Sequence, residues 1–123
     1  MNIGSTFYNK IELEKDEALL KKSKANLQIS FIIPQGGTLF LTNKRLIFRP
    51  SKLSISPEKP KSIILNLADI TEVEKRRRDM TNLLAGSFRR RLHIQYEDES
   101  YIFQVWGLGA WIKQIEEAVK NVL

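Results

Sequence analysis

Two runs of basic residues are the part of this 123-residue sequence whose residue types and spacing could bind a ligand. The first run is Lys75, Arg76, Arg77 and Arg78, and the second is Arg89, Arg90 and Arg91. Together with Asp79 they give the stretch 75–91 a net charge of +6, which equals the formal charge of the whole chain. A charge concentrated in this way favours an anionic partner: a lipid surface, a nucleic acid or an acidic protein. The alternative is that the two runs only keep a loop solvated.

The stretch between the two runs predicts an exposed loop. Leu83 and Leu84 are an apolar pair that no strand or helix pattern would bury, and Gly86 and Ser87 loosen the chain after them. The basic runs then stand at two strand exits, which could bring them side by side. On this interpretation the seven basic residues bind anionic lipid, at ~1 kcal/mol for each one near the surface. The two leucines would insert into the membrane.

The sequence has few residues suited to catalysis or metal binding. His93 alternates with Leu92 and Ile94, so we expect it on the less buried face of a strand, in a structural or solvent role. The chain has one histidine and no cysteine, which argues against the usual zinc sites. Residues 97–99 are acidic and indicate a solvated hairpin tip. We therefore expect no enzyme activity, no cofactor and no metal.

The composition predicts a single globular domain. Hydrophobic residues make up 42% of the chain and charged residues 28%. Residues 1–12 show no periodicity and are expected to be a loose lead-in, which leaves 13–123 as the domain. No apolar run approaches the ~20 residues of a membrane span, and the first residues lack the apolar core of a signal peptide. We expect a cytoplasmic protein that binds membranes peripherally.

The stretch "GGTLFLTNKRLIFRP" (Gly36 to Pro50) predicts a β-hairpin, because apolar residues alternate on both arms of a short polar turn. Leu39 and Leu41 share one face, while Phe40 and Ile47 are apolar on the second face, so we expect partial cover on both sides. The turn itself, from Thr42 to Arg45, has side chains that bond locally. Asn43 suits its tip because it tolerates a left-handed backbone. We expect Lys44 and Arg45 to be structural rather than the main ligand site.

The other elements are further strands and one helix. A first strand is centred on residues 25–31, two short strands around Asp69 cover 63–73, and a second hairpin covers 92–105. Apolar residues then recur at helical spacing over 108–123. Trp111 and Ile115 would plug the open end of the curled strands. Trp106 is also expected in the core.

These elements resemble a GRAM domain of the pleckstrin-homology superfold over roughly Glu14 to Val122. The residues that match the hairpin motif of that family are Leu39, Leu41, Thr42, Asn43, Lys44, Arg45, Leu46, Ile47 and Phe48. Ile63, Leu65, Asp69, Ile70 and Val73 are close to its second segment. The resemblance implies a mainly β fold, a partly open barrel of about seven antiparallel strands capped by a C-terminal helix. It also implies a binding module associated with membranes and anionic lipids.

Two functions follow from the sequence. The first is peripheral association with anionic membrane lipid through the basic loop, by charge rather than by selection of one headgroup, because the stretch "FIIPQGG" carries no charge. The second is a protein-interaction module that uses a strand edge, or the groove between strands and helix, to recognise an acidic partner. Nucleic acid is disfavoured, since Phe88 is the only aromatic residue in the loop available for stacking on bases.

Overall fold

The computed structural model describes residues 11–28, 34–51, 62–76 and 91–123. Within these ranges the chain forms seven strands, one short 3-10 helix and one α-helix. The predicted lead-in, apart from residues 11 and 12, lies outside the described residues. So do six predicted site residues: Arg77, Arg78, Leu83, Leu84, Arg89 and Arg90.

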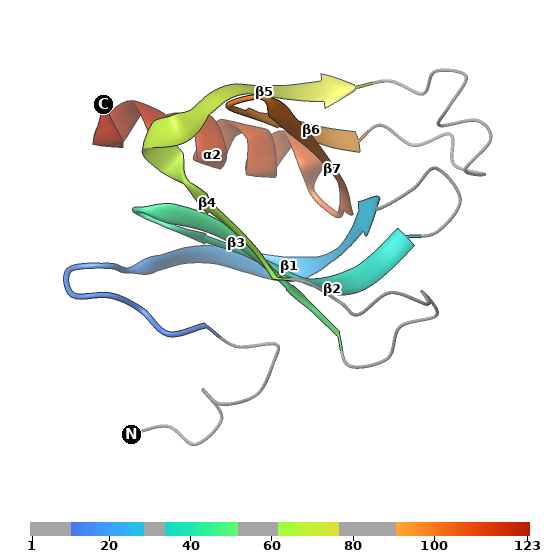
Figure 1. Ribbon diagram of the computed structural model, residues 1–123, viewed down its shortest axis with the longest axis horizontal. Coiled ribbons are helices and arrows are strands. Elements are labelled where there is room, and N and C mark those ends of the chain that lie inside the picture. The colour runs from blue at the N-terminus through green and yellow to red at the C-terminus, as the bar shows by residue number, and fades with distance from the viewer. Residues whose placement is uncertain (1–10, 29–33, 52–61, 77–90) are drawn as a thin grey trace.

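All seven strands belong to one antiparallel sheet of order β4-β3-β2-β1-β7-β6-β5. Their bounds are β1 Leu19–Gln28, β2 Pro34–Thr42, β3 Arg45–Pro50, β4 Ile63–Asn66, β5 Ile70–Arg76, β6 Arg91–Tyr96 and β7 Glu99–Val105. The sheet curls, so that β1 to β4 form one layer and β5 to β7 a second layer across from it (Figure 1). The predicted fold class is confirmed. The first strand begins earlier than expected, at Leu19, because residues 15 and 16 form a turn with Asp16 at φ 65°.

The hairpin of β2 and β3 is the centre of the first layer and has the predicted faces. Leu39 pairs with Phe48, and both side chains enter the core. On the second face Phe40 pairs with Ile47, and both are buried as well, so the hairpin is covered on both sides there. Gly37 is required between these strands, because a Cβ atom would lie 2.3 Å from the carbonyl oxygen of Arg49.

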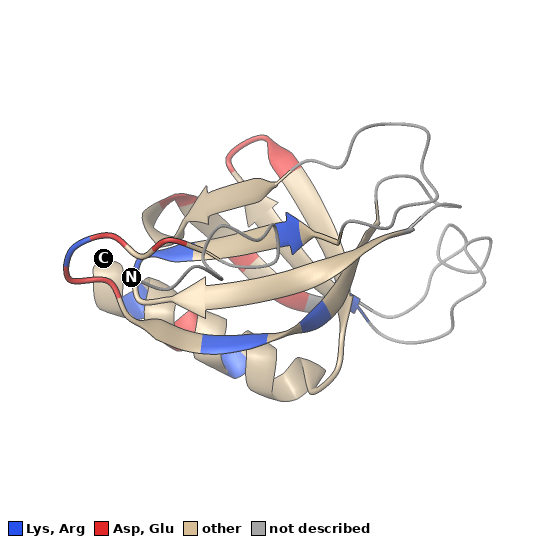
Figure 2. Ribbon diagram, turned by 90° about the horizontal axis from the view of Figure 1, so that it is seen from below, with Lys and Arg blue, Asp and Glu red and all other residues tan. Residues whose placement is uncertain are grey.

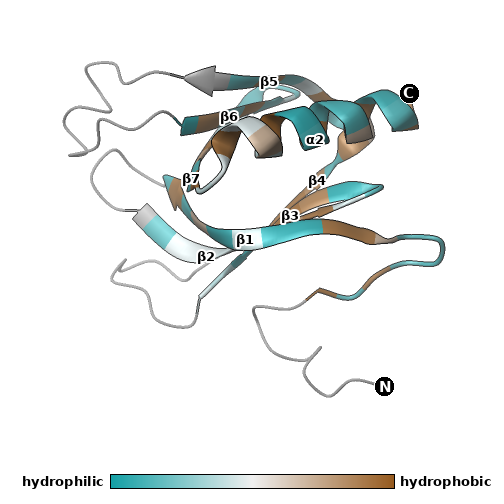
Figure 3. Cartoon of the chain, turned by 180° about the vertical axis from the view of Figure 1, so that it is seen from behind, coloured by the Kyte–Doolittle hydropathy of each residue, from teal (hydrophilic) through white to brown (hydrophobic). Residues whose placement is uncertain are grey.

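Helix α2 (Leu108–Val122) covers the opening between the two layers. It packs against β5, β6 and the 3-10 helix η2 (Leu67–Asp69). Hydrophobic and hydrophilic residues alternate along it (Figure 3), and Trp111, Ile115 and Ala118 are its buried residues. The Trp111 indole Nε1 donates to Ser23 Oγ over 3.1 Å, and Lys21 Nζ lies 5.4 Å from the Trp111 ring centroid. The predicted burial of Trp111 and Ile115 is therefore confirmed.

Trp106 contradicts its prediction. It follows the last residue of β7 and is 74% exposed, whereas Trp111 is fully buried. The reason is its place in the chain, where β7 has ended and Gly107 at φ 68° turns the backbone into α2. At such a junction neither the strand period nor the helix period directs a side chain to the core.

Candidate functional site

The strand ends that border residues 29–33, 52–61 and 77–90 lie at one end of the sheet, which we call the basic end (Figures 1 and 2). These strand ends are Gln28, Pro34, Pro50, Arg76 and Arg91. The stretch 77–90 carries four arginines and one aspartate, a net charge of +3, and 52–61 carries three lysines and one glutamate, a net charge of +2. Both basic stretches therefore start and finish at this end of the fold.

The described residues of the two predicted basic runs lie at the basic end. Arg76, the last residue of β5, pairs with Arg91, the first residue of β6, and Lys75 pairs with Leu92. The expectation that strand exits bring the runs side by side is confirmed for these residues. The expectation that Lys75, Arg76 and Arg91 belong to a loop is wrong, because the β5–β6 ladder extends to all three.

Arg91 is a buried structural residue rather than an exposed lipid contact. It is 6% exposed, and its Nη1 donates to Gln28 Oε1 over 2.7 Å. This bond joins the start of β6 to the end of β1, two elements 63 positions apart in the chain. The hydrogen bond offsets part of the free-energy cost of burying a charged guanidinium. Arg91 thus adds positive charge at the basic end without presenting its side chain to a surface.

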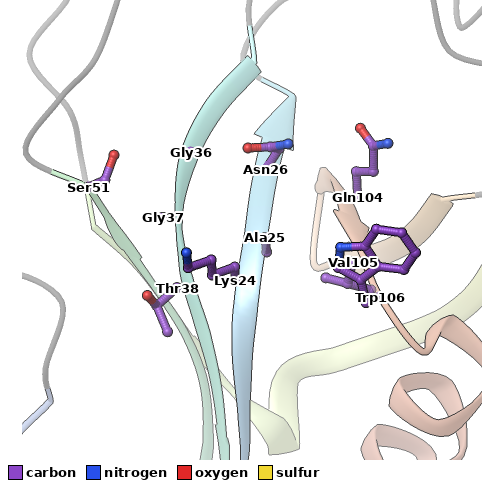
Figure 4. A pocket seen from close by; sticks show the side chains of 10 residues that line it. All are labelled: Lys24, Ala25, Asn26, Gly36, Gly37, Thr38, Ser51, Gln104, Val105 and Trp106. Carbon is purple, nitrogen blue, oxygen red and sulfur yellow. The ribbon is translucent and has the colours of Figure 1, made fainter.

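A polar hollow of about 540 Å³ lies next to these strand ends, over β1, β2 and the end of β7. Its polar side chains are Lys24, Asn26, Thr38, Ser51 and Gln104. Figure 4 shows Lys24 reaching from β1 across β2 towards Thr38, with Asn26 and Gln104 beside it and Trp106 at the rim. Among the residues that the structure describes, the lining contains one charged side chain, which is a cation, and no carboxylate.

Sheet register explains why this hollow exists. Lys24 pairs with Thr38, which pairs with Arg49 on β3, and the next row is Gln104, Asn26 and Gly36. Gly36 adds no side chain to the second row, and a Cβ there would lie 3.3 Å from Asn26 Oδ1. The sequence analysis did not find this site. Its members come from four separate strands or strand ends, and only the alternation of Lys22, Lys24 and Asn26 along β1 gave a signal.

The opposite end of the molecule is acidic. Four segments meet there: residues 12–17 before β1, residues 42–45 at the junction of β2 and β3, η2, and residues 97–99 at the junction of β6 and β7. They carry eight carboxylates and three basic side chains, a net charge of −5. The carboxylates are Glu12, Glu14, Asp16, Glu17, Asp69, Glu97, Asp98 and Glu99, and the bases are Lys15, Lys44 and Arg45. The red turn 12–17 in Figure 2 marks the end of the molecule remote from the basic end.

The turn of the first hairpin is bonded at this acidic end to the residues that precede β1. Arg45 donates to the Glu17 carboxylate through Nε at 2.8 Å and Nη2 at 2.6 Å, and Thr42 Oγ1 donates to it at 2.5 Å. The hydrogen bond from Arg45 is the main cause that lowers the pKa of Glu17 from 4.5 to about 2. Asn43 does not have the left-handed backbone that we expected. It accepts from Ala18 N through Oδ1 and donates to the Asp16 carbonyl.

His93 lies on the face of β6 opposite the core, as its alternation predicted, and is nevertheless buried. It is 4% exposed, although Leu92 and Ile94 on either side of it are the residues that enter the core. Its Nδ1 lies 3.3 Å from Glu74 Oε1 on the neighbouring strand β5. The prediction of the less buried face is confirmed, because Leu92 and Ile94 are 0% exposed and His93 is 4% exposed.

The family model of the GRAM domain matches residues 5–97. The chain belongs to the GRAM domain family. The match takes in residues 12–17, strands β1 to β6 and η2, and it ends before β7 and α2. A comparison with curated proteins gave no match.

Solved structures similar to this GRAM domain share its fold. The N-terminal PH domain of Vps36 matches with a TM-score of 0.68 at 19% identity, over 95% of this chain and 89% of that one. A C-terminal domain of an unknown protein from Leishmania infantum matches with a TM-score of 0.65 at 12% identity, over 85% and 86%. The DH/PH domains of PDZ-RhoGEF, in complex with activated RhoA, match with a TM-score of 0.61 at 18% identity, over 85% of this chain and 30% of that one. GRAM and PH-like domains are in general non-catalytic modules that bind lipid or protein.

Proposed function

We propose that this GRAM domain associates peripherally with membranes that contain anionic lipid, and that its basic end faces the bilayer. The observation that carries the proposal is the separation of charge along the molecule, with a net charge of −5 at one end and two basic stretches attached to the other. A charge distribution of this kind orients a protein in the field of an anionic surface. Among the described residues no helix is long and apolar enough to span a bilayer.

The basic residues proposed for this contact are Lys75, Arg76, Arg77, Arg78, Arg89 and Arg90, with Leu83 and Leu84 as the apolar residues that insert. Arg91 adds positive charge at the basic end but does not itself touch the bilayer, since its buried guanidinium is bonded to Gln28. The polar hollow over β1, β2 and the end of β7 adds a place where one anionic headgroup can lie against Lys24, with the hydroxyl groups of Thr38 and Ser51 as donors.

Sedimentation with vesicles tests the proposal. The protein is mixed with neutral phosphatidylcholine vesicles and with vesicles that also contain phosphatidylserine, over a range of salt concentrations. We expect binding to the anionic vesicles only, and a steep loss as salt rises, because exposed charges are screened within ~8 Å at physiological ionic strength. An absence of binding to anionic vesicles even at low salt would contradict the lipid proposal and favour the alternative, an acidic protein partner.

Charge reversal provides the matched control. The double variant Arg77→Glu/Arg90→Glu should abolish vesicle binding and keep the fold. The variant Lys113→Glu/Lys120→Glu changes the net charge equally but on the exposed face of α2. It should retain most of the binding. Equal loss in both variants would mean that total charge, and not the basic end, drives the association.

A further inference from the structure

Glu72, Glu74 and His93 come together on the outer face of the β5–β6 hairpin. Glu72 and Glu74 are two residues apart on β5, and Val73 between them packs against the core, so both carboxylates lie on the other face. His93 is the cross-strand partner of Glu74. Each of the three residues offers a ligand atom, and these atoms all lie within 4.8 Å of one another.

We infer that these three side chains form a binding site for a divalent transition-metal ion such as Zn²⁺. Two carboxylate oxygens and one imidazole nitrogen are a donor set that zinc accepts, with distances of about 2.0–2.2 Å to each ligand. Two ligands of a tetrahedral ion at such distances lie about 3.3 Å apart. His93 Nδ1 and Glu74 Oε1 lie 3.3 Å apart in the structure. The sequence predicted no metal because the chain has one histidine and no cysteine. One histidine with two carboxylates is a donor set that this reasoning did not consider.

Metal binding would cost these ligands little conformational entropy, because the strands already hold them in place. The register of β5 and β6 fixes the Cα atoms of Glu74 and His93 opposite each other, and the His93 side chain is 5% exposed. Glu72 is exposed, so its carboxylate can rotate towards the other two and leave the outward side open to water as a fourth ligand. Mg²⁺ and Ca²⁺ bind through oxygen ligands, so the imidazole selects against both.

Glu74 and His93 lie two residues from the Arg76–Arg91 pair at the end of the β5–β6 ladder. Arg76 follows Glu74 by two residues on β5, and Arg91 precedes His93 by two residues on β6. The Arg91 guanidinium is bonded to Gln28 on β1, across the sheet from β5. A metal ion would link β5 to β6 two residues from the Arg76–Arg91 pair and so brace the hairpin at the basic end.

The single histidine makes a direct experiment available, because every imidazole signal comes from His93. Tag-free, ¹⁵N-labelled protein is titrated with ZnCl₂, and the long-range ¹H–¹⁵N spectrum of the imidazole is recorded. We expect a saturable shift of the Nδ1 resonance with Zn²⁺, none with Mg²⁺, and a higher melting temperature with Zn²⁺. An unmoved Nδ1 resonance in excess Zn²⁺ would overturn the inference.

Glu72 is the exposed ligand, so its substitution tests metal binding without disturbing the fold. Glu72→Gln should lower Zn²⁺ affinity at least ~10-fold by calorimetry, since even the loss of an outer partner costs a metal site that much. Asp98→Asn removes one charge from the exposed turn between β6 and β7 and should leave affinity unchanged. Equal affinity in the wild type and Glu72→Gln would overturn the three-ligand site. The readout involves no lipid, so it is separate from the vesicle experiments.

Discussion

Glu17 holds Arg45 through two hydrogen bonds of 2.6 and 2.8 Å, and the side chain of Glu17 is fully buried. The pair joins the chain just before β1 to the turn between β2 and β3. The Lys44 carbonyl accepts from Leu67 N at the start of η2, so the same turn also anchors the connection to β5. The family's hairpin motif therefore has a structural task at the acidic end of this domain, remote from the proposed membrane contact.

The stability of the domain should fall in acid between about pH 4.5 and pH 2. The pKa of Glu17 is lowered from 4.5 to about 2 by its bonds to Arg45, so the unfolded state takes up this proton first as pH falls. The stabilisation, about 3 kcal/mol at neutral pH, is complete above pH 4.5 and is lost towards pH 2. Urea denaturation across this range measures it. Glu17→Gln should be less stable at pH 7 and its curve should be flatter; parallel curves would contradict the assignment.

Arg45→Ala should cost about 3 kcal/mol of unfolding free energy, because it leaves the buried Glu17 carboxylate without its cation. Lys44→Ala is the matched control at the next residue. Lys44 Nζ donates only to the Lys15 carbonyl at the exposed surface, so its removal should change stability by less than ~0.5 kcal/mol. Vesicle binding of Lys44→Ala should also be unchanged. A tenfold loss of binding would place this turn in the ligand site.

Two adjacent glycines should respond differently to alanine. Gly37→Ala places a Cβ 2.3 Å from the backbone oxygen of Arg49, and backbone cannot move aside as a flexible side chain can. We expect a loss of ~1–3 kcal/mol or more. Gly36→Ala meets only the ends of the Asn26 and Ser51 side chains, at 3.3 and 3.8 Å, and should cost less than ~1 kcal/mol. Chemical denaturation of both variants checks the order, and equal costs would refute the close packing of β2 and β3.

The two tryptophans should differ in their contribution to stability. Trp111→Ala leaves a cavity at a fully buried position of α2 and should lower the free energy of unfolding by ~3–5 kcal/mol. Trp106→Ala removes a side chain that is 74% exposed and should change stability by less than ~0.5 kcal/mol. Thermal unfolding of both variants is the measurement. An unchanged melting temperature for Trp111→Ala would show that α2 does not close the barrel.

The polar hollow should add to vesicle binding through Lys24. Lys24→Gln is compared with Lys22→Gln, which removes the same charge from the same face of β1, two residues outside the lining. We expect the loss of affinity for anionic vesicles to be larger for Lys24→Gln at every salt concentration. Equal losses would mean that the hollow holds no headgroup and that β1 contributes only its charge.

The sequence by itself determined the strands, the helix and most of the core. Period-two alternation predicted the faces of Leu39, Leu41 and Phe48, and helical spacing predicted the burial of Trp111 and Ile115. These predictions succeeded because the direction of a side chain along a strand or helix follows from local backbone geometry. The hairpin motif added the family and, through it, the order of the elements.

Only the tertiary structure decided what the charged and polar side chains do. Arg91 is buried because Gln28, 63 positions away, receives its guanidinium, and Arg45 is structural because Glu17 lies 28 positions before it. The hollow around Lys24 and the meeting of His93 with Glu72 and Glu74 likewise depend on strand register. Polar contacts are directional and join residues distant in the chain, so no local pattern predicts them. The sheet that brings these residues together is assembled by hydrophobic burial, which depends on area rather than on a particular partner.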